Sequence, residues 1–193
     1  MRRAVVVFTA TLALALSARG ASAQAFLNPY IDTTFATPSL NGDGTKPGFG
    51  VSFGVAGKIV GFETDISYYP ELIDKSANAL AKSDVFTFSG SLLVGPRIGS
   101  VRPYGAIGAG DLLLNVTSVS SVLVPNPASI SNHYFSFNAG GGVMGYFGSH
   151  LGVRGDLRYF KAYGFNIDDL AAAHLSLNSF DFWRANIGLL VTF

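Results

Sequence analysis

The sequence predicts an all-β fold: an eight-stranded antiparallel up-and-down β-barrel that spans a membrane. Apolar residues recur at every second position in eight separate segments, the period of a strand with one apolar face. Charged residues make up only 13% of the chain, about half the share usual in soluble domains, whereas Gly (23) and Phe (16) are abundant. No segment after the amino terminus resembles a transmembrane helix. A closed barrel is then the remaining way to pair every backbone polar group in lipid.

The amino-terminal residues have the pattern of a secretory signal peptide. Arg2 and Arg3 precede an apolar run over residues 5–17, and Ala21-Ser22-Ala23 is a small-x-small cleavage pattern. The run is too short for a membrane anchor, which needs about 20 apolar residues. We therefore expect a signal peptide at residues 1–23 and one outer-membrane β-barrel domain at residues 24–193.

The charge and cysteine content exclude several classes of function. Three of the thirteen Lys and Arg residues lie in the expected signal peptide, so the remaining chain has a formal charge of 10 − 12 = −2. No basic stripe indicates a nucleic-acid partner. Cys is absent, which excludes disulfides and thiolate metal sites. The stretch Asn41-Gly42-Asp43-Gly44 lacks the spaced carboxylates of a calcium loop, so it is interpreted as a turn. No cofactor or metal is expected.

The eight alternating segments are each about as long as the roughly 9 to 11 residues that cross a bilayer at a tilt. They cover residues 25–35, 49–56, 60–70, 86–97, 102–115, 135–143, 151–161 and 182–193. In the last segment the outward set runs Trp183, Ala185, Ile187, Leu189, Val191, Phe193, and Arg184 lies on the other face. In the fifth, Tyr104, Ala106, Leu112 and Leu114 are expected outward, and Gly105, Ala109, Asp111 and Asn115 inward.

Charged residues gather on the face predicted to point into the barrel. They are Glu63, Asp65, Arg97, Asp111, Arg154, Asp156, Arg158 and Arg184. One interpretation is a conduction or proton pathway. The other, which we favour, is a network of satisfied ion pairs, because an eight-stranded barrel is only wide enough for its own side chains and buried charges persist when they are paired. Inward glycines are expected to make room for the long arginines.

The connections alternate in length. Short links are expected at residues 57–59, 98–100 and 148–149, and long ones at 36–48, 71–83, 116–132 and 164–179. Short turns on one rim and long loops on the other are typical of transmembrane barrels. The third long connection has no charge over residues 117–132, whereas the fourth carries Asp168, Asp169 and His174.

Several motifs together resemble the small OmpA/OmpX-type eight-stranded outer-membrane β-barrels. They are the signal peptide, Val101-Arg102-Pro103-Tyr104-Gly105, Asn138-Ala139-Gly140-Gly141-Gly142 and the last strand that ends in Phe193. The resemblance implies a Gram-negative outer membrane, with both termini periplasmic. It also implies contact with outer-membrane lipids and lipopolysaccharide, and with the barrel-assembly machinery through the strand that ends in Phe193. The peptidoglycan-binding domain of the OmpA type is not matched, so no cell-wall tether is implied.

The expected function is that of a non-catalytic integral outer-membrane protein, whose surface loops serve envelope integrity, adhesion or the binding of an extracellular partner that the sequence does not name. Two alternatives stay open: a lipid A-modifying hydrolase and a narrow-channel porin-like protein. His174-Leu175-Ser176 matches the His-x-Ser pair of the lipid A deacylases, but no Asp or Glu follows Asp181 to complete it. A lipocalin-like carrier is disfavoured because its apolar residues would face inward. No catalytic, cofactor-binding or metal-binding residue is assigned.

Overall fold

The computed structural model describes residues 23–35, 45–70, 81–118, 129–163 and 179–193. They form eight strands: β1 Gln24–Phe35, β2 Lys46–Ala56, β3 Val60–Tyr69, β4 Ala81–Val94, β5 Val101–Ser118, β6 Ser129–Phe147, β7 Leu151–Tyr163 and β8 Ser179–Thr192. Within the described ranges, no helix is long and apolar enough to cross a membrane.

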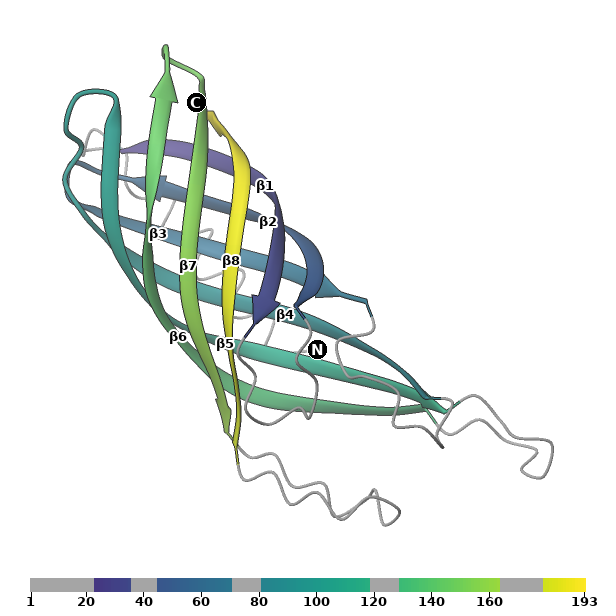
Figure 1. The fold of residues 1–193 in the computed structure, drawn as a ribbon. Coiled ribbons are helices and arrows are strands. Elements are labelled where there is room, and N and C mark those ends of the chain that lie inside the picture. Colours follow the sequence, from purple (N-terminus) through teal and green to yellow (C-terminus); the bar gives the residue numbers. More distant parts are fainter. Residues whose placement is uncertain (1–22, 36–44, 71–80, 119–128, 164–178) are drawn as a thin grey trace.

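The strands close into one antiparallel barrel (Figure 1). Each strand pairs with its neighbours in the sequence, and β1 pairs with β8 to complete the closure. The predicted fold class is therefore confirmed. Strands β5 and β6 extend further than the apolar alternation indicated, because their backbone ladder continues through polar residues as far as the pair Thr117 and Ser129.

The short connections predicted at residues 57–59 and 148–149 are confirmed, whereas the one predicted at 98–100 begins earlier, because β4 ends at Val94. All three lie together at one rim (Figure 1). Gly99 and Gly148 have φ angles of 60° and 77°, in the left-handed region that glycine adopts without a Cβ clash. Both chain ends of the barrel meet this rim: the amide of Phe193 donates to the carbonyl of Ala25 at 3.0 Å. Nearby, Nε2 of Gln24 donates to the carbonyl of Ser149 at 3.3 Å.

Where the side chains are described, seven strands point as predicted: the predicted apolar sets face outward, and the inward faces carry small and polar residues together with some large apolar ones. The prediction for the fifth strand is wrong. Tyr104, Ala106 and Leu112 are buried inside the barrel, whereas Ile107 is 62% exposed on the outer face. Apolar residues occupy both faces of β5, so alternation alone does not decide its direction, and one residue of shift inverts every side chain of a strand.

Two apolar layers fill the ends of the barrel interior. The layer near the short turns, which we call the apolar plug, consists of Phe26, Ala56, Leu93, Tyr104, Ala106, Met144, Tyr146 and Leu190. Nearer the other end lies an aromatic layer of Tyr69, Phe160 and Phe182. The rings of Phe160 and Phe182 stack at a centroid distance of 5.1 Å, and Tyr69 meets Phe182 edge-on at 6.2 Å. Most buried charges lie between these layers, whereas Arg102 and Thr192 are buried at the rim of the short turns, where they donate to turn carbonyls.

Candidate functional site

The charged interior of the barrel is the candidate site. Six of the eight charges predicted to point inward are buried there, each at most 5% exposed: Glu63, Asp65, Arg154, Asp156, Arg158 and Arg184. Strand β7 supplies three of them, because alternate residues of a strand share a face. Strand β3 supplies the two residues Glu63 and Asp65, and β8 supplies Arg184.

Four of these residues form a closed set of ion pairs that we call the ion-pair ring. Arg154 contacts Glu63 at 2.5 Å and Asp156 at 3.1 Å. Arg158 contacts the same two carboxylates, with its Nε 2.7 Å from Oδ1 of Asp156 and its Nη2 on Oε1 of Glu63. Two positive and two negative charges make the ring neutral. Mutual pairing is the condition under which buried charges are tolerated.

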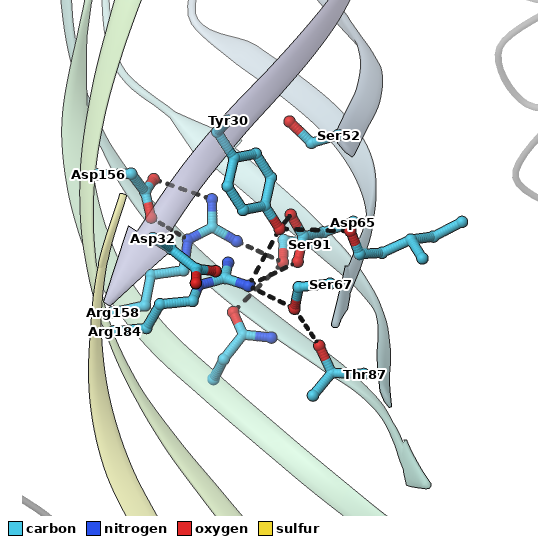
Figure 2. Close-up of polar contacts among 12 residues, drawn as sticks. Tyr30, Asp32, Ser52, Asp65, Ser67, Thr87, Ser91, Asp156, Arg158 and Arg184 are labelled. Carbon is cyan, nitrogen blue, oxygen red and sulfur yellow. Dashed lines mark hydrogen bonds and ion pairs between the residues drawn. The ribbon is translucent and has the colours of Figure 1, made fainter. Parts of the chain in front are cut away.

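A second group lies around Arg184 (Figure 2). Nη1 of Arg184 contacts Oδ1 of Asp65 at 2.8 Å, and the hydroxyl of Tyr30 donates to Oδ2 of the same carboxylate at 2.7 Å. The hydroxyl of Tyr69 donates to Oδ2 of Asp32 at 2.9 Å. Strands β1, β3 and β8 are thereby joined through the interior as well as through their backbone ladders.

Hydroxyl groups connect the ring to the barrel wall. The hydroxyl of Tyr104 donates to Asp156 at 2.5 Å and accepts from Nε of Arg154 at 2.6 Å. Nη1 of Arg154 also donates to Ser52 at 3.2 Å, and Nη1 of Arg158 to Ser91 at 3.1 Å. Because β5 turns Tyr104 inward, its hydroxyl lies between Arg154 and Asp156 and contacts both.

Inward glycines make room for the network, although mostly for tyrosines. A Cβ at Gly142 would overlap the hydroxyl of Tyr104, and one at Gly50 would overlap that of Tyr30. Among these positions only Gly140 faces an arginine, Arg158. The prediction that inward glycines accommodate arginines therefore holds at Gly140, whereas Gly108 leaves room for Ser91 and Asn138.

Two predicted inward charges lie elsewhere. Arg97 is exposed in the turn after β4, because the strand ends at Val94 and alternation no longer applies. Its Nη1 donates to Gln24 at 3.2 Å, and its guanidinium lies 4.1 Å from the ring centre of Tyr146. Asp111 is half-buried on the outer face because β5 is inverted relative to the prediction.

Of the buried charged residues that the structure describes, two, Arg102 and Asp32, are not among the eight predicted inward charges. Arg102 is 2% exposed, and its guanidinium donates to the carbonyls of Gly57 at 2.8 Å and Ile59 at 3.1 Å, in the turn between β2 and β3. It lies two positions before Tyr104 on the same face of β5. A sequence prediction with the correct direction of β5 would have placed Arg102 inside the barrel.

The geometry favours a structural network over a conduction pathway. The ion-pair ring and the group around Arg184 lie between the apolar plug and the aromatic layer, so charges do not line a continuous route through the described part of the barrel. Among the described residues, no three His, Asp or Glu side chains are grouped to hold a metal ion. The pair His174 and Ser176 lies outside the described residues.

The chain is similar to a known family over most of its length. The model of the outer membrane protein beta-barrel domain matches residues 8–189. The chain belongs to this family. The family indicates the outer membrane of a Gram-negative type of cell. The signal peptide and the periplasmic position of the termini stay predictions. No curated protein matches the chain.

Solved structures agree on the fold. Neisserial surface protein A (NspA) is 14% identical, with a TM-score of 0.58 over 89% of this chain and 97% of that one. A major outer membrane protein from Thermus thermophilus is 13% identical, with a TM-score of 0.57 over 89% and 100%. Ail, the attachment invasion locus protein of Yersinia pestis, solved with the heparin analogue sucrose octasulfate, is 16% identical, with a TM-score of 0.51 over 87% and 97%. At these identities the likeness concerns the fold alone.

Proposed function

We propose that this outer-membrane barrel is a non-catalytic anchor whose long connections contact a partner outside the cell. One observation carries the proposal: the interior is filled by paired charges between two apolar layers, which supports a framework more than a passage. On rigid scaffolds of this kind, binding residues are generally carried by the loops.

The connections that would carry this function join strand ends on one side of the barrel, opposite the three short turns (Figure 1). The intervals 36–44, 71–80, 119–128 and 164–178 contain five acidic residues and one lysine, which gives a formal charge of 1 − 5 = −4. The acidic residues are Asp43, Glu71, Asp74, Asp168 and Asp169, and the lysine is Lys75.

This charge constrains the partner. Ail was solved with a heparin analogue, a sulfated polyanion. Adding Lys46 and Lys82 at the adjoining strand ends changes the sum to 3 − 5 = −2, which is still negative. A net negative surface disfavours polyanions, so a partner with cationic or uncharged apolar groups fits better. The uncharged interval 119–128, with Val122, Leu123 and Val124, and the acidic interval 164–178 are the candidate contact segments.

Loop replacement tests the proposal. Each of the intervals 119–128 and 164–178 is replaced by a Gly/Ser segment of equal length, and the turn at residues 57–59 on the opposite rim is altered as the matched control. Cells that display each protein are measured for adherence to host-cell and abiotic surfaces at several salt concentrations. We expect at least one loop replacement to reduce adherence while the turn variant matches the wild type. Equal adherence by all variants and by cells without the protein would refute the proposal.

Mass spectrometry of lipid A separates the proposal from the hydrolase alternative. Lipid A is compared in cells without the protein, with the wild type, and with Ser176→Ala or His174→Ala. We expect the same lipid A in all four. Loss of an acyl chain in the wild type that Ser176→Ala restores would establish the hydrolase instead.

A further inference from the structure

Among the described side chains of the strands, Lys161 is the only Lys or Arg on the outer face of the barrel. Its strand, β7, presents Leu151, Val153, Gly155 and Leu157 outward before it reaches Tyr159, Lys161 and Tyr163. From residue 151 to 159 there are 159 − 151 = 8 steps, about 26 Å of strand. A tilt of about 40° shortens this to about 20 Å, most of an apolar band of about 25 Å. Lys161 therefore lies at the edge of the apolar band, on the side of the long connections.

Aromatic rings surround this position. The ammonium of Lys161 lies 5.5 Å from the ring centre of Tyr163, and Tyr163 meets Phe137 edge-on at 6.0 Å. On the other side, Tyr159 packs against Trp183 at 5.4 Å. Tyr and Trp gather where the bilayer meets its headgroups, which supports the depth estimated from the strand.

The carboxylate opposite Lys161 has another partner. Asp181 is paired with Lys161 in the ladder between β7 and β8, but its Oδ2 accepts a hydrogen bond from the hydroxyl of Tyr159 at 2.6 Å. The ammonium lies instead over the ring of Tyr163. A lysine at this depth extends its charge toward the headgroups, because an ammonium buried in hydrocarbon is costly.

We propose that Lys161, with Tyr163 beside it, binds the phosphate of a phosphorylated glycolipid in the outer leaflet. A phosphate supplies the negative charge that the ammonium does not obtain from Asp181, and the hydroxyl of Tyr163 can donate to another phosphate oxygen, whereas the single proton of the Tyr159 hydroxyl is already donated to Asp181. The choice of leaflet rests on the expected orientation, with the long connections outside. The site does not involve the loops, so a failure of this proposal would not affect the proposed function, and a failure of the proposed function would not affect this proposal.

Thermal unfolding in nanodiscs tests the site. The discs contain phosphatidylcholine with bis-phosphorylated lipid A or with the same lipid after phosphatase treatment. The variants are Lys161→Gln, Lys161→Arg and, as a matched control, Lys58→Gln, which removes an exposed lysine from the turn at the opposite rim. We expect phosphorylated lipid A to raise the unfolding midpoint of the wild type, Lys161→Gln to lose at least half of that shift, and the other two variants to keep it. Equal shifts in Lys161→Gln and wild type would overturn the site.

A labelling experiment on the wild type gives an answer that does not depend on whether a variant folds. The amines are acylated in each type of disc, and the modified lysines are mapped by mass spectrometry. Lys161 should be protected by phosphorylated lipid A and not by the dephosphorylated lipid, while Lys58 reacts equally in both. Equal protection by the two lipids would show that acyl chains alone cover the residue, and the proposal would be wrong.

Discussion

Arg154 and Glu63, 91 positions apart in the sequence, form a buried ion pair at 2.5 Å across the barrel interior. The pair joins β7 to β3, which are not neighbours in the barrel wall. Both residues are buried, and each has a second ion-pair partner: Asp156 for Arg154, and Arg158 for Glu63. The four residues form a unit whose charges cancel.

Replacing one member of this pair should lower the free energy of unfolding far more than replacing both. Arg154→Met leaves Glu63 and Asp156 facing a single arginine, so we expect a loss of about 3–5 kcal/mol. Adding Glu63→Gln leaves the neutral pair of Arg158 and Asp156. Urea titrations of refolding in lipid vesicles would measure the free energy of unfolding of the wild type, the two single variants and the double variant. Additive costs would show that the two residues do not interact.

An arginine on the outer face should be poorly tolerated. Leu189→Arg and Ile107→Arg place a charge among lipid chains and should each cost about 2–4 kcal/mol if they lie near the midplane. Ser89→Asn, on the inner face of β4, should cost much less. The variant at Ile107 also tests the direction of β5: a cost as small as that of Ser89→Asn would mean that this residue faces the interior.

The barrel should not form a wide solute pore. The apolar plug and the ion-pair ring occupy the interior in series, so ions would have to displace buried and paired side chains. We expect planar-bilayer recordings of the purified protein to show no stable, large conductance. A persistent water-filled conductance would contradict the packed interior and favour the narrow-channel alternative.

The last strand should direct assembly into the membrane. Phe193 is 73% exposed on the outer face, and its amide closes the seam to β1 through the carbonyl of Ala25. Deleting Phe193, or changing it to Asp, should sharply reduce the heat-modifiable, membrane-inserted form on gels. A Phe193→Tyr variant, which keeps an aromatic terminus, serves as the control and should insert nearly normally. Normal insertion of the deletion variant would remove the last residue from the assembly signal.

The sequence by itself determined the strand number, the approximate positions of the three short turns and the face of seven strands. It could do so because lipid demands a regular alternation of apolar residues, and turns demand particular residues such as Gly99 and Gly148. The sequence also predicted the burial of Glu63, Asp65, Arg154 and Arg184. These charges lie on the strand face opposite the apolar set, and that face points into the barrel.

Only the tertiary structure decided which charges pair and which way β5 faces. Alternation is a local property, and β5 carries apolar residues on both faces, so Tyr104 and Ile107 are equivalent by that criterion. The closed ladder gives β5 one register, in which Tyr104 lies opposite Gly142 and reaches Arg154 and Asp156. Likewise, Arg154 meets Glu63 in addition to Asp156 of its own strand because barrel closure brings β3 and β7 within reach of each other across the interior.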